Sequence, residues 1–369
     1  MKKLLFSLLI LPACTLSYGQ NTFVPDNNFE QALIDLGLDN ALDDSVATAN
    51  IDTLSYLHIS WKDIDDLTGI ADFSSLTYLH AGSNNLTSLD VSQNSELITL
   101  NCELNDLSTL TLGSNPHLKS LFCRANLLTN LDLSGLPALY TLSTENNLLT
   151  QLNVSHNPLL DYLNIQGNLI WNLNTGSNLM LEGLNCSATP ITALDLSQNP
   201  LLNTLYCFTT QLTELDLSQN PALIFLHCND VPGLETLNIK NGNNLELLTF
   251  EALGNPNLFC IQVDTPLYSE LNWNSVDSWA SFQEDCTLGL EESGENTFSL
   301  YPNPSVEQIY FSEPLGNVSI RDLSGRMIIT HSELIEKVNL SQFPAGIYLL
   351  RGTTENGKPA STRFIKSEF

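Results

Sequence analysis

The sequence predicts a repeat solenoid of about 21 residues per turn, with short parallel strands, little helix, an N-terminal helical cap and a small C-terminal β-sandwich. One leucine recurs at steps of 21 residues, at Leu79, Leu100, Leu121, Leu142, Leu163, Leu184, Leu205 and Leu226. Around each of these leucines apolar and polar residues alternate, which is typical of a strand. From Phe298 onward the period is lost and a different composition begins. Because a single turn cannot bury its apolar edge alone, the turns are expected to stack.

Residues 1–19 have the pattern of a cleaved secretory signal. A basic start is followed by an apolar run, residues 4–11, that is too short to span a bilayer, and by small residues before Gln20. An alternative is lipidation of Cys14, because the residues before it resemble a bacterial lipobox. No later stretch of the sequence is long and apolar enough for a transmembrane helix.

Residues 20–50 are predicted to cap the open end of the solenoid. Within them, residues 26–37 have the pattern of a short amphipathic helix, with Phe29, Leu33 and Leu36 on one face. A solenoid needs such a cover because its first turn has no neighbour on one side.

The solenoid itself is predicted over residues 51–263. In each turn the period-two alternation points residues such as Leu121 and Cys123 inward and leaves their neighbours facing water. A second apolar line, seen at Leu194 and Leu196, forms the return side of the turn. A polar column stands where the chain turns and is expected to bond free backbone groups. Its members are Asn105, Asn126, Asn147, Asn168, Thr189 and Thr210.

Five cysteines share one inward slot of the repeat: Cys102, Cys123, Cys186, Cys207 and Cys228. Thr144, Ile165 and Phe250 fill the same slot in other turns, which indicates a packing position. Free cysteine packs there as a small hydrophobic side chain. A disulfide between turns is an alternative, because neighbouring Cα atoms are about 5 Å apart, although parallel side chains in register rarely have the required dihedral angle. A metal cluster is a further alternative. We predict a structural ladder of free thiols.

The repeat text, LxxLxCxxNxL at Leu118–Leu128, resembles the leucine-rich repeat family over roughly 200 residues. The cysteine slot resembles the cysteine-ladder repeats of internalin-type surface adhesins, whose repeats also have 21 residues. The resemblance implies a secreted or cell-surface protein of the adhesion type.

The outward columns of the strands predict a ligand-binding surface on the concave strand face. Tyr206, Phe208, Phe225 and His227 fall on two adjacent turns, and Tyr162 stands in the same columns two turns earlier. Clustered exposed aromatic side chains are typical contact residues for a protein or sugar ligand. The alternative is a local apolar patch that the C-terminal cap covers.

Other polar constellations carry less chemistry. His58 and His80 occupy equivalent outward slots but have no third ligand for a metal. An interrupted acidic column (Asp90, Asp132, Asp195 and Asp216) is better explained by solvated or backbone-bonding carboxylates than by calcium. The formal charge of −28 disfavours nucleic acid as a partner. No catalytic motif is present, so we predict no enzyme, no cofactor and no bound metal.

Residues 264–290 are predicted to cap the last turn, and residues 291–296 to form a linker. Cys260 and Cys286 lie outside the ladder. In an oxidising compartment they are predicted to form a disulfide that closes a loop of about 25 residues.

Residues 297–369 are predicted to be a small β-sandwich of about seven short strands, with Asn356-Gly357 as a hairpin turn. Four motifs of this tail follow one another in the order that is typical of the C-terminal sorting domain of type IX secretion cargo: Tyr301-Pro302-Asn303-Pro304, Asp322-Leu323-Ser324-Gly325, Pro344-Ala345-Gly346-Ile347-Tyr348 and Arg363-Phe364-Ile365-Lys366. The tail resembles that family. The resemblance implies that the type IX machinery is a partner through residues 297–369.

The whole sequence therefore predicts a secreted or outer-membrane surface protein. We expect an adhesion-type role without catalysis, in which the strand face binds a protein or a glycan. A structural surface spacer without a specific ligand is the alternative.

Overall fold

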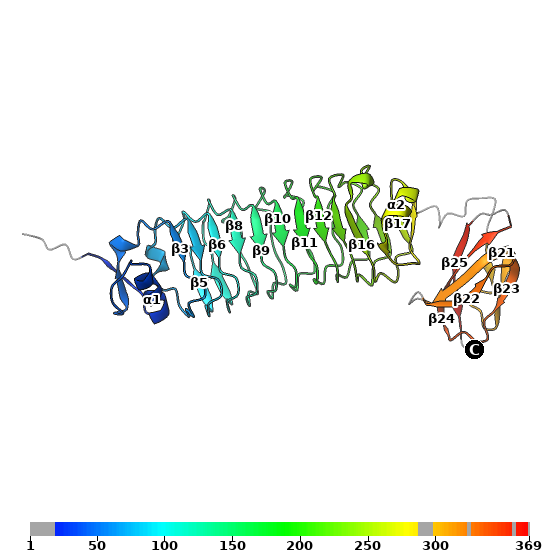
Figure 1. Ribbon diagram of the computed structural model, residues 1–369, viewed down its shortest axis with the longest axis horizontal. Helices are drawn as coiled ribbons and strands as arrows, with labels where there is room; N and C mark the ends of the chain where they lie inside the picture. Colours follow the sequence, from blue (N-terminus) through cyan, green and yellow to red (C-terminus); the bar gives the residue numbers. More distant parts are fainter. Residues whose placement is uncertain (1–18, 287–297, 323–325, 356–358, 368–369) are drawn as a thin grey trace, which may run out of the picture.

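The computed structural model describes residues 19–286, 298–322, 326–355 and 359–367. Almost all of the predicted signal segment, including Cys14, and the predicted linker 291–296 lie outside these residues. The predicted solenoid is confirmed: the turns stack side by side in a long row, with short strands along one face (Figure 1).

The main face of the solenoid is one parallel sheet of eleven strands. In spatial order these are β3 (Tyr56–His58), β4 (Tyr78–His80), β6 (Thr99–Asn101), β8 (Ser120–Phe122), β9 (Thr141–Ser143), β10 (Tyr162–Asn164), β11 (Gly183–Asn185), β12 (Thr204–Tyr206), β14 (Phe225–His227), β16 (Thr249–Ala252) and β18 (Ser275–Val276). The repeated leucines pair directly across the sheet, for example Leu121 with Leu142. Side chains in one slot of the repeat therefore form straight columns along the sheet.

The return side is only partly paired. Strands β5 (Ser88–Asp90) and β7 (Thr109–Thr111) form a two-stranded sheet. A second sheet contains β13 (Glu214–Asp216), β15 (Thr236–Asn238), β17 (Cys260–Gln262) and β19 (Ser281–Gln283). Between the two sheets the return segments contain no assigned strand. Three single 3-10 turns also occur, at Thr48–Asn50, Ile70–Asp72 and Asn244–Glu246.

The N-terminal cap consists of helix α1 (Asn27–Asp35) and an antiparallel pair of strands, β1 (Asn21–Phe23) and β2 (Ser45–Ala47). Asp26 begins the helix, because one carboxylate oxygen accepts the N–H groups of Asn28 and Phe29. Phe29 is fully buried and its ring lies 6.1 Å from that of Phe73 in the solenoid.

One residue of the predicted helix face is wrong. Leu36 is 52% exposed, whereas Phe29 and Leu33 are fully buried. The helix ends at Asp35, so Leu36 lies beyond the last residue with helical side-chain spacing. Leu38, which follows the turn at Gly37, packs against the core instead.

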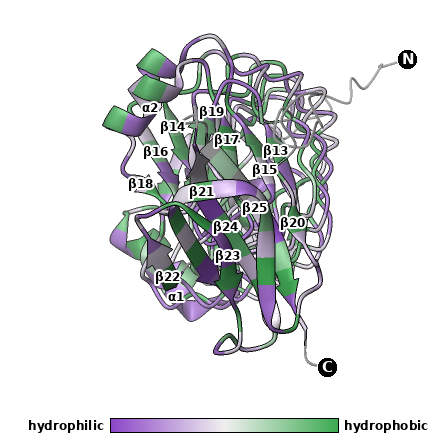
Figure 2. Cartoon of the chain, turned by 90° about the vertical axis from the view of Figure 1, so that its right-hand side faces the viewer, coloured by the Kyte–Doolittle hydropathy of each residue, from purple (hydrophilic) through white to green (hydrophobic). Residues whose placement is uncertain are grey.

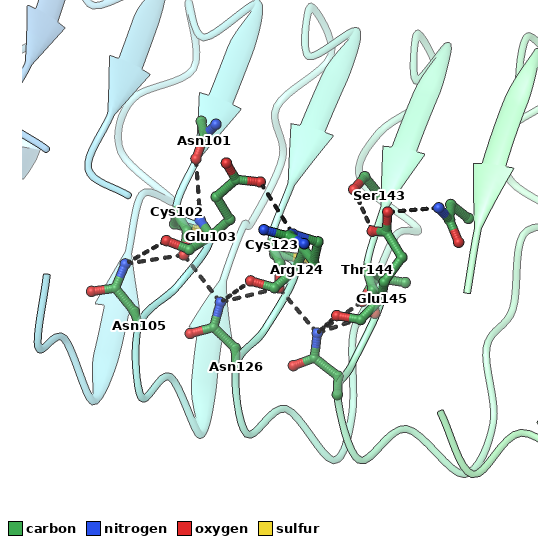
Figure 3. Close-up of polar contacts among 12 residues, drawn as sticks. Asn101, Cys102, Glu103, Asn105, Cys123, Arg124, Asn126, Ser143, Thr144 and Glu145 are labelled. Atoms are coloured by element: carbon green, nitrogen blue, oxygen red, sulfur yellow. Dashed lines mark hydrogen bonds and ion pairs between the residues drawn. The ribbon is translucent and has the colours of Figure 1, made fainter. Parts of the chain in front are cut away.

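The first asparagine column bonds three segments of backbone at once, as Figure 3 shows for Asn105 and Asn126. The Asn126 amide donates to the Cys102 carbonyl of the preceding turn at 3.0 Å and to the Cys123 carbonyl of its own turn at 3.0 Å. Its Oδ1 accepts the Leu107 N–H at 2.9 Å. Thr189 is shorter, and its hydroxyl donates to the Cys186 carbonyl in its own turn. The asparagines thus connect adjacent turns.

A second asparagine column, on the opposite edge, was not predicted. Its members are fully buried and donate to carbonyls of earlier turns: Asn94, Asn115, Asn157, Asn178, Asn199 and Asn220. Leu136 interrupts this column, and there Gly135 approaches the neighbouring turn so closely that a Cβ atom would lie 2.0 Å from the Gly113 carbonyl oxygen.

The C-terminal end of the solenoid is covered by helix α2 (Pro266–Asn272) and three packed aromatic rings. Trp273 lies 5.0 Å from Phe250 and 5.6 Å from Phe282 between ring centroids. Cys260 and Cys286 form a disulfide that joins β17 to the chain after β19.

The tail is an antiparallel β module with its own core. Its strands are β20 (Leu300–Tyr301), β21 (Gln308–Asp322), β22 (Met327–His331), β23 (Ile335–Asn339), β24 (Gly346–Thr354) and β25 (Pro359–Lys366). The long strand β21 pairs with β20, β22, β23 and β24, so it holds the described strands in one sheet around Ile309, Val318 and Phe364. Figure 2 shows bands of hydrophobic and hydrophilic residues along these strands. The predicted hairpin at residues 356–357 lies outside the described residues.

Replacement of Asn126 by Ala is expected to destabilise the solenoid by about 1–3 kcal/mol, because the buried N–H of Leu107 and the carbonyls of two turns lose their partner. Urea unfolding followed by circular dichroism measures the difference. The matched control is Asn130→Ala, since Asn130 is an exposed asparagine one turn edge away. Equal unfolding midpoints for the two variants would contradict a load carried by the buried amide.

Candidate functional site

The middle of the strand face is a ladder of hydrogen-bonded polar side chains. Ser143 donates to Glu145, and the Asn164 amide reaches the other oxygen of this carboxylate at 2.6 Å (Figure 3). One turn further, Asn185 donates to Gln166 at 3.0 Å. Each step crosses from one strand to the next because equivalent slots are in register. The ladder therefore holds the outward side chains in fixed positions.

The predicted aromatic cluster lies on β12 and β14. The rings of Tyr206 and His227 meet edge to face, with their centroids 4.8 Å apart. Phe225 pairs in register with Thr204, and Phe208 follows Cys207 on the same face of the chain. All four aromatic side chains are half-buried. The structure thus brings Tyr206 and His227 into contact and places Phe208 and Phe225 on the same two turns.

Tyr162 reaches toward this cluster across a strand that has small outward residues. A Cβ atom on Gly183 would lie 2.6 Å from Cδ2 of Tyr162, so the ring covers the glycine. Burial, and then the charge of Glu145, raise the pKa of the Tyr162 hydroxyl. On the same strand line, Ser187 is fully buried and its hydroxyl has no hydrogen-bond partner among the described residues. Glycine at position 183 is therefore what lets the tyrosine lie flat.

A carboxylate fixes the imidazole of the cluster. Nδ1 of His227 lies 3.3 Å from Oε2 of Glu251 on β16, and the same oxygen accepts the Asn229 amide at 2.9 Å. This arrangement orients the ring of His227 against Tyr206. It also provides a hydrogen-bonding rim beside the aromatic side chains.

A second aromatic cluster on β3 and β4 was not predicted as such. Tyr56 stacks on Tyr78 with centroids 4.6 Å apart, and His58 stacks on His80 at 4.5 Å. Burial, and then the neighbouring His58, lower the pKa of His80. The signal was present in the sequence as two Tyr-Leu-His triplets one turn apart. Sequence analysis considered the two histidines only as metal ligands, and missed that their tyrosines share the same columns.

The five ladder cysteines are fully buried and free. Burial raises the pKa of Cys123, Cys186 and Cys228 to about 12. Cys207 has two ladder neighbours, and burial followed by the effect of Cys228 and Cys186 raises the pKa of its thiol as well. At neutral pH these thiols are therefore protonated and poor nucleophiles.

The aspartate column of the return side bonds its own backbone. Asp132 accepts the Ser134 N–H and Asp195 accepts the Ser197 N–H, both at 2.9 Å. These hydrogen bonds lower the pKa of both carboxyl groups. Within the described ranges, no group of three or more His, Cys, Asp or Glu residues is arranged to hold a metal ion.

Comparison with protein families identifies the tail. Residues 299–367 match the family described as "Secretion system C-terminal sorting domain". This chain carries a sorting domain. The domain indicates type IX secretion, with release or attachment at the outer membrane or cell surface. Among the residues that the structure describes, no helix is long and apolar enough to cross a membrane. No curated protein matches the chain.

Three solved structures are similar to the solenoid. The functional domain of InlJ from Listeria monocytogenes, which includes a cysteine ladder, is 24% identical over 96% of this chain and 100% of that chain, with a TM-score of 0.35. Internalin C2 from the same species is 19% identical over 64% and 99% of the two chains, with a TM-score of 0.48. A leucine-rich repeat protein of Leptospira interrogans is 19% identical over 58% and 72%, with a TM-score of 0.43. Because these TM-scores are low, the repeat assignment rests on the 21-residue turns themselves.

In the chain without its signal segment, the thiols are expected to resist Ellman's reagent at pH 8, because thiolate is the reactive form and burial keeps the thiols protonated. After denaturation in urea, five thiols should react, since Cys260 and Cys286 are paired. Absorbance at the thionitrobenzoate band measures both states. Rapid reaction of the native chain would show that the ladder is accessible to solvent.

Proposed function

We propose that this protein acts at the cell surface or in secreted form as a non-catalytic binding protein. Its strand face would bind a protein or a glycan in an adhesion-type role. The observation that supports this most directly is the cluster of Tyr206, Phe208, Phe225 and His227 on β12 and β14, with Tyr162 close by.

The geometry of this cluster suits recognition. Half-buried aromatic side chains already have few free rotamers, so a ligand that covers them loses little entropy on binding. Tyrosine and histidine also offer a polar atom beside an apolar ring. The contact of His227 with Glu251 and the polar ladder around Asn164 would form the rim of such a surface.

A structural spacer is the second candidate, and it also has an observation in its favour. The polar side chains of the strand face bond one another, as Asn185 and Gln166 do at 3.0 Å. A face that satisfies its own hydrogen bonds needs no ligand for stability. Binding experiments separate the two functions.

Simultaneous replacement of Tyr206, Phe208 and Phe225 by Ala is expected to weaken ligand binding by at least about thirtyfold, because buried aromatic contacts carry most of an interface's energy. Glycan arrays and pull-down of surface proteins, followed by calorimetry on the ligand found, measure the loss. The control is Tyr140→Ala, since Tyr140 is 49% exposed and lies outside the strand. If the triple variant folds and binds as the native chain does, the strand-face site is lost. If the native chain binds no ligand, the spacer function stands.

Deletion of the tail from residue 297 onward is expected to keep the protein in the periplasm, because the matched sorting domain at residues 299–367 directs export. Immunoblots of periplasmic, outer-membrane and medium fractions measure the distribution. A truncation at residue 369 alone, which leaves the strands of the tail intact, serves as the control. Normal amounts of the deletion variant outside the cell would contradict the role of the tail.

A further inference from the structure

One turn of the return side departs from the repeat by a tryptophan. The column that follows the inward residue of the return side reads Thr87, Ser108, Thr129, Thr150, Trp171, Thr192 and Thr213. Trp171 is 57% exposed, although every other member of this column is small and polar. Core packing does not require the ring, because the neighbouring turns stack without one.

The charge of the return side changes at the same turn. The aspartate column reads Asp90, Thr111, Asp132, Asn153, Asn174, Asp195 and Asp216. The two asparagines therefore remove the negative charge on the turns beside Trp171, in a chain whose formal charge is −28. The surface around the tryptophan is neutral.

A shallow groove lies at this place. Trp171, Gln151, Asn153, Asn172 and Asn174 line a cavity of about 300 Å³, which we call the Trp171 groove. A second cavity of about 270 Å³ shares Gln151 and Asn153 with it and continues toward the preceding turn. The groove thus runs along the solenoid and combines one aromatic ring with four side-chain amides.

The amides of the groove have donors to offer. Oδ1 of Asn153 accepts the Ser155 N–H at 3.0 Å, and Oδ1 of Asn174 accepts the Gly176 N–H at 2.9 Å. These bonds fix the two side chains while their Nδ2 groups have no protein acceptor. The backbone adds further groups, because the N–H groups of residues 150–154 and 171–174 donate no backbone hydrogen bond. This part of the return side lies between the two paired sheets.

We propose that the Trp171 groove binds a neutral glycan. The apolar face of a pyranose ring would stack on the indole, and its hydroxyl groups would bond the amides, which both donate and accept. The neutral lining matches an uncharged ligand and favours it over anionic chains, which the acidic remainder of the surface repels. Successive turns repeat at about 4.8 Å, close to the length of one pyranose unit, so sugar residues can follow the stack turn by turn.

This site does not depend on the proposed function of the strand face. The Trp171 groove is on the return side, whereas Tyr206, Phe225 and His227 lie on the main sheet. The two surfaces can therefore be tested with separate variants of the same chain.

The test uses the chain without its signal segment and five neutral hexasaccharides: cellohexaose, maltohexaose, laminarihexaose, xylohexaose and mannohexaose. At least one is expected to change the tryptophan fluorescence in a saturable way, and calorimetry gives its affinity. Trp171→Thr is expected to weaken binding about tenfold or more, because the stacking surface is lost. Asn153→Asp with Asn174→Asp is expected to weaken it as well, since the carboxylates cannot donate. All three substitutions introduce residues that neighbouring turns carry, so the fold is preserved.

Trp61→Thr is the matched control, because Trp61 is 77% exposed but belongs to the first turns of the solenoid. It should bind the hexasaccharide as the native chain does, and so should the strand-face triple variant. Binding that survives in Trp171→Thr overturns the proposal, and its loss in the strand-face variant would place the glycan there instead. Absence of binding to all five probes at millimolar concentration also overturns it.

Discussion

Buried side-chain amides at both edges of the turn are what the rest of this solenoid depends on. A turn that folds back without a helix leaves peptide groups unpaired in the interior, and each would cost about 1–3 kcal/mol if nothing replaced water. Asn126 on one edge and Asn157 on the other bond carbonyls of two successive turns or segments. The amides therefore set the spacing of the stack, and the leucines fill the interior that this spacing defines.

Because the interior is determined by repeated columns, departures from a column on the outside have to be explained by something other than packing. Gly183 replaces a side chain and allows Tyr162 to cover its strand. Trp171 replaces a threonine and is left 57% exposed. Leu136 replaces an asparagine on an inner edge, and there the compensation is visible in the close backbone approach of Gly135 to Gly113. Inner departures are repaired locally, whereas outer departures change what the surface can bind.

Much of this architecture follows from the sequence because the repeat forces it. The slot of Cys123 could be assigned inward from alternation alone, and so could the bonding role of Asn126. The end of helix α1 could not, since Leu36 fits the apolar period but lies beyond the last helical residue. Contacts between outward side chains were also partly hidden. The stack of Tyr56 on Tyr78 depends on the register of β3 and β4, and the interrupted pairing of the return side depends on twist that the sequence pattern does not encode.

The two classes of cysteine show how position decides chemistry within one exported chain. Cys260 and Cys286 lie at the open end of the stack, where they meet and form a disulfide. Cys123 and Cys186 lie between leucines, and burial raises their pKa to about 12. Oxidation requires both a thiolate and a path for the oxidant, and the folded stack removes both from the ladder. A thiol in this slot is smaller than leucine and less polar than serine, so it fills the narrow column without demanding a hydrogen bond. The ladder is therefore compatible with an oxidising location for as long as the turns remain stacked.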